Sequence, residues 1–108
     1  MTAQADVTVI IPTLRRPDSL ERAVRSALAQ VGVVDRLREI IVVDNDPEAS
    51  SRELTTRLAA EASLPVVWRH APRPGVATAR NEGLAATTAP LIAFLDDDEA
   101  ASTGWLGP

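Results

Sequence analysis

The chain of 108 residues contains no cysteine, which excludes disulfides and thiolate metal sites. It also contains no lysine, since all eleven basic residues are arginines. A phosphate-binding P-loop, which requires a lysine, is therefore excluded. Any metal would have to be held by carboxylates or by the single histidine, His70.

Excess positive charge and long apolar runs are missing as well. The net charge is -4 and the sequence pI is about 4.9, so there is no basic field to attract polyanions, and we expect no nucleic-acid partner. No apolar run approaches the roughly 20 residues that span a bilayer, so we expect no transmembrane segment. The first residues lack the basic and apolar regions of a signal peptide. We therefore expect a cytoplasmic location, including the inner face of the membrane.

The apolar pattern predicts one domain over residues 1–108, built from alternating strands and helices. The predicted strands are the runs at residues 7–11, 40–43, 66–68 and 91–95, the first ended by Pro12. The predicted helices cover residues 19–30, a segment carrying Leu54 and Leu58 on one face, and residues 75–87. Capping boxes are predicted at Asp18 and at Ser50. This β-α-β-α-β-α-β order predicts an α/β fold with a Rossmann-like parallel sheet and helices on both faces.

Acidic residues follow two of these strands. Asp44 ends the second, and three consecutive aspartates, Asp96, Asp97 and Asp98, follow the fourth. In parallel sheets ligands bind beyond the carboxyl ends of the strands. Three adjacent carboxylates repel one another, and a divalent cation such as Mg²⁺ or Mn²⁺ would relieve that repulsion. The alternative is that these acids only end the strand and cap the following turn.

Other ligand-binding classes fit the turn after the first strand less well. A dinucleotide-binding domain needs a glycine-rich turn there, but residues 12–16 read PTLRR and include no glycine. A P-loop fails for the same reason. A receiver-like phosphoacceptor would place paired acids after the first strand, which has none.

Four segments together resemble the N-terminal half of a family 2 glycosyltransferase of the GT-A fold. They are VTVIIPT at residues 7–13, EIIVVDN at 39–45, GVATARNEG at 75–83 and LIAFLDDDE at 91–99. The segments occur in the family's order and cover nearly the whole chain.

The resemblance implies specific roles for individual residues. Asp96 and Asp98 match the outer acids of the family's DxD motif and would hold Mg²⁺ or Mn²⁺, with Asp98 as the leading ligand. The metal would bridge the two phosphates of a nucleotide-sugar donor and assist departure of the nucleoside diphosphate. The residues implied in binding the donor itself are Pro12, Thr13, Asp44, Asn45, Arg80, Asp96 and Asp97. Asn45 departs from the family, which often has an aspartate there, and so leaves the choice of base open.

The implied reaction is transfer of a sugar to an acceptor hydroxyl with inversion, the acceptor being a glycan, a lipid or a small molecule. Such a transfer needs a general base, which in this family lies well past the DxD motif. No residue of this chain is assigned that catalytic role, although Asp97 and Glu99 are nearby carboxylates. The chain therefore looks like a donor-binding region that ends soon after the DxD motif. The alternative is a nucleotide-binding module or remnant that lacks the acceptor half and the base.

Four further residues are interpreted more simply. Arg15 and Arg16 are taken as solvated turn residues, with contact to phosphate as a lesser alternative. Arg80 is given a second interpretation, as an ion-pair partner of Asp96 or Asp98. His70 is interpreted as a loop residue rather than a ligand.

Overall fold

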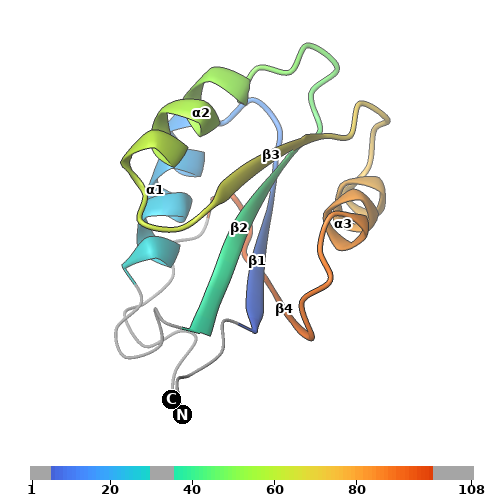
Figure 1. Cartoon of the computed structure of the whole chain (residues 1–108). Coiled ribbons are helices and arrows are strands. Elements are labelled where there is room, and N and C mark those ends of the chain that lie inside the picture. Colours follow the sequence, from blue (N-terminus) through green and yellow to red (C-terminus); the bar gives the residue numbers. More distant parts are fainter. Residues whose placement is uncertain (1–5, 30–35, 99–108) are drawn as a thin grey trace.

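The computed structural model describes residues 6–29 and 36–98, and its elements alternate as the sequence predicts (Figure 1). In chain order they are β1 (Val7–Thr13), α1 (Pro17–Leu28), β2 (Leu37–Asp44), α2 (Arg52–Glu61), β3 (Val66–His70), α3 (Val76–Ala85) and β4 (Leu91–Phe94).

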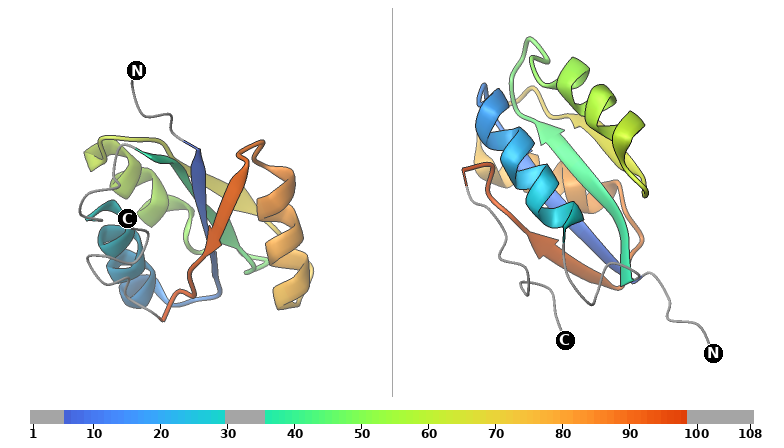
Figure 2. Two further views of the ribbon diagram at one scale, coloured as in Figure 1. Left: turned by 90° about the horizontal axis from the view of Figure 1, so that it is seen from below. Right: turned by 90° about the vertical axis from the view of Figure 1, so that its left-hand side faces the viewer.

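The four strands form one parallel sheet in the order β3-β2-β1-β4. Helices α1 and α2 lie on one face of this sheet and α3 lies on the other (Figure 2). The predicted α/β fold with helices on both faces is therefore confirmed. Because β1 is paired on both sides, its carboxyl end lies between the ends of β2 and β4.

The central strands are buried on both faces, which explains their continuous apolar sequence. Side chains alternate along β1, so that Val9 and Ile11 pack beneath α1 and α2 while Ile10 packs beneath α3. On β2 the same alternation separates Val42 from Val43. All five side chains are fully buried. The sheet therefore supports two apolar layers, one on each face.

The prediction that Pro12 ends the first strand is wrong, since β1 continues to Thr13. Pro12 pairs with Val43 of β2 in the parallel register. Alternate residues of a parallel strand direct their backbone groups to the same neighbour, and the carbonyl of Ile10 accepts from Leu95 on the β4 side. The amide that proline lacks would thus face β4 beyond the last paired residue, where no ladder bond is lost.

The two predicted capping boxes, at Asp18 and Ser50, are also wrong. The N-cap positions of α1 and α2 are Arg16 and Ser51, and neither makes a side-chain capping bond. A proline at the first helical position starts α1 early, because its fixed φ already suits a helix. The Ser51 hydroxyl instead donates to Asp44, at the end of β2.

Helix α3 lies unusually close to the sheet at Gly83, a buried glycine. A Cβ atom built on Gly83 would lie 2.6 Å from Cγ2 of Ile10 and 3.2 Å from Cγ2 of Val43. Both neighbours are branched side chains locked in the fully buried core. The glycine therefore sets how closely α3 can approach β1 and β2.

We predict that Gly83→Ala destabilises the fold by about 1–3 kcal/mol, the usual cost of overpacking a filled core. Urea unfolding at neutral pH would measure the change. Leu84→Ala, a substitution at the next and largely exposed position of the same helix, is the matched control and should cost less. A more stable Gly83→Ala variant would show instead that α3 can shift outward and gain the higher helix propensity of alanine.

Candidate functional site

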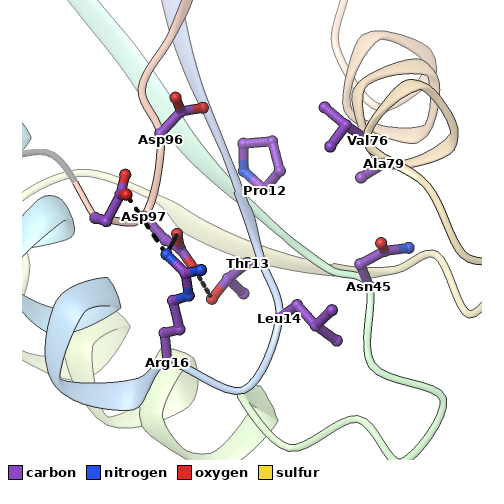
Figure 3. A pocket seen from close by; sticks show the side chains of 10 residues that line it. Pro12, Thr13, Leu14, Arg16, Asn45, Val76, Ala79, Asp96 and Asp97 are labelled. Atoms are coloured by element: carbon purple, nitrogen blue, oxygen red, sulfur yellow. Dashed lines mark hydrogen bonds and ion pairs between the residues drawn. The ribbon is translucent and has the colours of Figure 1, made fainter.

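A pocket of about 360 Å³ opens at the carboxyl edge of the sheet (Figure 3). It is bounded by the end of β1, the loop into α1, the residue after β2, the first turns of α3 and the turn after β4. Its lining residues are Pro12, Thr13, Leu14, Arg16, Asn45, Val76, Ala79, Asp96, Asp97 and Asp98. Most of the site residues expected from the sequence meet here, whereas Asp44 and Arg80 do not line the pocket.

The turn of residues 96–98, called the acid turn below, is tied to the end of β1 by one buried hydrogen bond. The hydroxyl of Thr13 donates to Oδ2 of Asp97 at 2.9 Å, and both side chains are buried. Asp97 therefore points inward and holds the turn in place. Asp96 and Asp98 on either side of it are exposed.

Arg16 supplies the positive charge beside the acid turn. Its Nη1 atom lies 3.7 Å from Oδ1 of Asp97 and 3.5 Å from Oδ2 of Asp98. The interpretation of Arg16 as a solvated turn residue is therefore incomplete, since the side chain is 56% exposed yet faces the carboxylates. The sequence contains a signal for this contact, because Arg16 directly precedes Pro17 at the start of the helix that follows β1. That helix begins at the same edge of the sheet as the acid turn.

Arg80 lies on α3 with its guanidinium carbon 5.2 Å from the centre of the Phe94 ring, on β4. This cation–π contact stabilises an exposed arginine by about 0.5–1 kcal/mol. The contact described for Arg80 is with Phe94, whereas the ion pairs described for the acid turn are those of Arg16. The predicted contact of Arg80 with a donor stays a prediction.

Asp44 supports the loop after β2 from beneath. Its side chain is fully buried, and Oδ1 accepts from the amide of Asp46 at 2.9 Å. Oδ2 accepts from the amide and the hydroxyl of Ser51, at 2.8 and 2.7 Å, and from the indole of Trp68 at 3.3 Å. The nucleoside-binding role expected of Asp44 stays a prediction, and it would require this loop to open.

Asn45 lines the pocket and fixes the loop that leads into α3. Its amide nitrogen donates to the carbonyls of Ala71 and Arg73, both at 2.7 Å. Gly75, at φ 120°, then turns the chain into α3, a conformation that favours glycine. With the nitrogen engaged, the side-chain oxygen of Asn45 is the atom that remains to accept from a ligand.

A second network holds the far side of the loop after β2. Arg15 donates to the buried carboxylate of Asp46 at 3.0 Å. Hydrogen bonds from Arg15, from the Ser50 side chain and from the Glu48 amide hold the pKa of Asp46 well below its ordinary value. His70 is the last residue of β3 rather than a loop residue, and its Nε2 donates to the Asp46 carbonyl at 2.8 Å.

The donor chemistry of the acid turn suits a hard cation, although the turn is not a closed metal cage. Within residues 6–29 and 36–98, no group of three or more histidine or acidic side chains converges as a metal site. Mg²⁺ in proteins is often bound by one or two carboxylates together with substrate phosphates. Asp96 and Asp98 could supply those carboxylates. The crowding expected of three aspartates is reduced here by Arg16 and Thr13.

The model of the glycosyl transferase family 2 matches the chain over residues 8–108. The chain belongs to this family. The family match includes the four segments on which the resemblance was based, except Val7 at the start of the first, so that resemblance is confirmed.

The curated relatives include a succinoglycan biosynthesis protein and a glycosyltransferase. The succinoglycan biosynthesis protein ExoM of Rhizobium meliloti is 40% identical over 101 residues, which cover 93% of this chain and 32% of ExoM. The pre-mycofactocin glycosyltransferase of Mycobacterium tuberculosis is 39% identical, over 94% of this chain and 19% of its own length. The chain thus spans a third or less of the length of these two relatives.

Solved structures show the same fold. The mannosyltransferase PcManGT from Pyrobaculum calidifontis, solved with GDP-Man and Mn²⁺, aligns with a TM-score of 0.70 at 25% identity, over 94% of this chain and 30% of its own. TarS residues 1–349 from S. aureus align with a TM-score of 0.72 at 19% identity, over 94% and 30%. These likenesses confirm the GT-A type of fold. In the part of this chain that the structure describes, no helix is long and apolar enough to cross a membrane.

We predict that Asn45→Asp, which introduces the residue frequent in the family, destabilises this chain by about 1–3 kcal/mol. A carboxylate cannot donate to the carbonyls of Ala71 and Arg73, and would face both with its negative charge. Urea unfolding at pH 7 measures the change. Asn81→Asp, the same substitution on the exposed surface of α3, is the control and should cost much less. Equal stability of Asn45→Asp and the native chain would contradict the proposed role of the amide.

The lowered pKa of Asp46 predicts a specific loss of stability in acid. Because the folded pKa lies below the unfolded value of about 3.8, the stabilisation is fully present above that pH and is lost as the pH falls toward the folded pKa. The native chain should therefore lose free energy of unfolding more steeply below about pH 4 than Asp46→Asn. Denaturant titrations from pH 7 to acid measure both slopes. Arg15→Gln should also make the free energy of unfolding fall less steeply with decreasing pH. An unchanged slope in both variants would refute the assignment of this acid sensitivity to the pair of Arg15 and Asp46.

Proposed function

We propose that this chain is the donor-binding part of a glycosyltransferase that transfers a sugar from a nucleoside-diphosphate donor to an acceptor hydroxyl with inversion. The observation that supports this most is the pocket at the carboxyl edge of the sheet, where the acid turn faces the end of β1 and Asn45 across the same space. Its volume of about 360 Å³ is within the usual range for small-molecule sites. Membership of family 2 supports a nucleotide-sugar as the ligand of that pocket.

The proposed metal ligands are Asp96 and Asp98, on the two sides of the inward-pointing Asp97. A divalent ion, Mg²⁺ or Mn²⁺, would supply Lewis-acid stabilisation of the charge on the departing diphosphate. The solved complex of PcManGT with GDP-Man and Mn²⁺ supports this cofactor class. Thr13 keeps the acid turn in register with β1 through its hydrogen bond to Asp97.

The remaining donor-binding roles follow from the position of each residue. Pro12 and Thr13 form the floor of the pocket between the acid turn and Asn45. We propose that the side-chain oxygen of Asn45 accepts a hydrogen bond from the base of the donor. We propose that Asp44 binds the nucleoside once the loop that begins with Asn45 opens, and that Arg80, which lies on α3 outside the pocket lining, reaches the donor when it binds.

The acceptor and the general base belong to the other half of the reaction. We propose a glycan, a lipid or a small molecule as acceptor, with the base outside these 108 residues. A location in the cytoplasm, at the inner face of the membrane, is part of the same proposal. The second candidate function is a nucleotide-binding module without turnover, since the residues that line the pocket account for binding of a donor and none of them is assigned as a base.

Calorimetric titration with UDP, GDP and dTDP, with and without Mn²⁺, tests donor binding. We predict that Asp98→Ala weakens the Mn²⁺-dependent binding of the preferred nucleotide by about tenfold or more, because a charged ligand group contributes about 1.5–3 kcal/mol. Glu53→Ala, which removes an exposed carboxylate on α2, is the charge-matched control and should leave that binding unchanged.

Two results would overturn the proposal. Nucleotide binding that does not depend on Mn²⁺, or that Asp98→Ala leaves intact, would remove the acid turn from the site. A donor-hydrolysis assay on the same samples bears on the second candidate function, since metal-dependent hydrolysis of the donor would exclude a module without turnover.

A further inference from the structure

Arg16 lies across one side of the pocket, at the point where β1 leads into α1. Its Nη1 atom is 3.5 Å from Asp98 and 3.7 Å from Asp97. Both distances are longer than those of ordinary N–H···O hydrogen bonds, which lie at about 2.7–3.2 Å. The guanidinium therefore balances the charge of the acid turn without being fixed to it.

These ion pairs are weak enough to exchange. The side chains of Arg16 and Asp98 are 56% and 59% exposed, and exposed pairs contribute about 0–1 kcal/mol. The neighbouring pair differs, since Arg15 makes a 3.0 Å hydrogen bond to an Asp46 carboxylate that is 1% exposed. Of two consecutive arginines, one is held in a tight pair and the other in a loose one.

A metal ion and Arg16 would compete for the same carboxylate. A divalent cation on Asp98 places two positive charges where the guanidinium now lies, and the two cations repel each other. A nucleoside diphosphate in the same pocket offers Arg16 a better partner, because guanidinium binds phosphate oxygens in a bidentate manner. The side chain already lines this pocket and is 56% exposed, so it is placed to reach a ligand bound there.

We infer that Arg16 is a displaceable counter-ion, which offsets part of the negative charge of the acid turn before loading and moves to the diphosphate when the metal takes Asp98. This inference rests on the proposed function, because it assigns one residue a part in the loading of that site. Metal and nucleotide then favour each other's binding. Metal binding releases Arg16 for the phosphates, and nucleotide binding draws Arg16 away from the metal ligand, as linkage requires.

The test measures Mn²⁺ and nucleotide binding separately by calorimetry on the native chain and on Arg16→Gln. Without nucleotide, the variant should bind Mn²⁺ about two- to fivefold more tightly, since removal of an exposed ion pair and of a like charge frees Asp98. With Mn²⁺ present, the variant should bind the diphosphate about tenfold more weakly, because a charged hydrogen bond is lost. The factor by which Mn²⁺ improves nucleotide binding should therefore fall.

The sign of the first effect separates the possible roles of Arg16. If Arg16 only held the turn in shape, Arg16→Gln would weaken Mn²⁺ binding. If Arg16 were a phosphate ligand that never touched the acids, Mn²⁺ binding without nucleotide would not change. Either result would refute the counter-ion role. Arg22→Gln, which removes one exposed positive charge from α1 outside the pocket, controls for net charge and should change neither affinity.

Failure of this inference can be distinguished from failure of the proposed function. If the native chain binds Mn²⁺ and nucleotide through Asp98 but Arg16→Gln leaves Mn²⁺ affinity unchanged, only the counter-ion role is wrong. If neither the native chain nor Arg16→Gln binds Mn²⁺, both the proposed function and the inference are wrong. Arg16→Lys is informative as well, since a retained charge should keep Mn²⁺ affinity near the native value while giving up the bidentate geometry.

Discussion

The buried hydrogen bond from Thr13 to Asp97 is the interaction on which the candidate site depends. Thr13 is the last residue of the central strand, and Asp97 belongs to the turn after β4, so the bond joins segments 84 residues apart. β4 is paired with β1 only as far as Ile10 and Phe94. The amide of Leu95 still donates to the Ile10 carbonyl, and beyond that bond the side-chain contact between Thr13 and Asp97 holds the turn to β1. It holds the Asp97 side chain buried against β1, while Asp96 and Asp98 on either side of it stay exposed.

The other acids at this edge are each stabilised by different local hydrogen bonds or ion pairs. Asp44 is buried and accepts from backbone amides, a hydroxyl and an indole, while Asp46 is paired with Arg15. A buried carboxylate without such partners would be costly, and in this structure both carboxylates support the loop after β2. Among the described residues, the exposed Asp98 makes a loose contact with Arg16. The edge therefore combines a rigid support with a few exchangeable charges, which suits the binding of a charged ligand.

The order of the elements, the parallel sheet and the identity of the edge could be predicted because each depends on local pattern. The β-branched runs of β1 and β2 are continuous, and acids follow β2 and β4. The partners of those acids could not be predicted in the same way. Contact between Arg16 and the acid turn depends on the direction that the Arg16 side chain takes after the end of β1, and the sequence pattern does not give that direction. The predicted capping boxes were wrong for a related reason. The Ser51 hydroxyl donates to Asp44, a tertiary contact that a local sequence pattern does not contain.

The two consecutive arginines show how the backbone assigns different tasks to identical residues. Arg15 has φ 54°, in the left-handed region, which costs a non-glycine residue about 1–2 kcal/mol. That turn of the chain directs Arg15 to Asp46 on the α2 side and lets Arg16 face the acid turn. The tight pair with buried Asp46 offsets the strain. The well-anchored Arg15 therefore fixes a backbone conformation in which the adjacent Arg16 can remain loosely held and free to exchange partners.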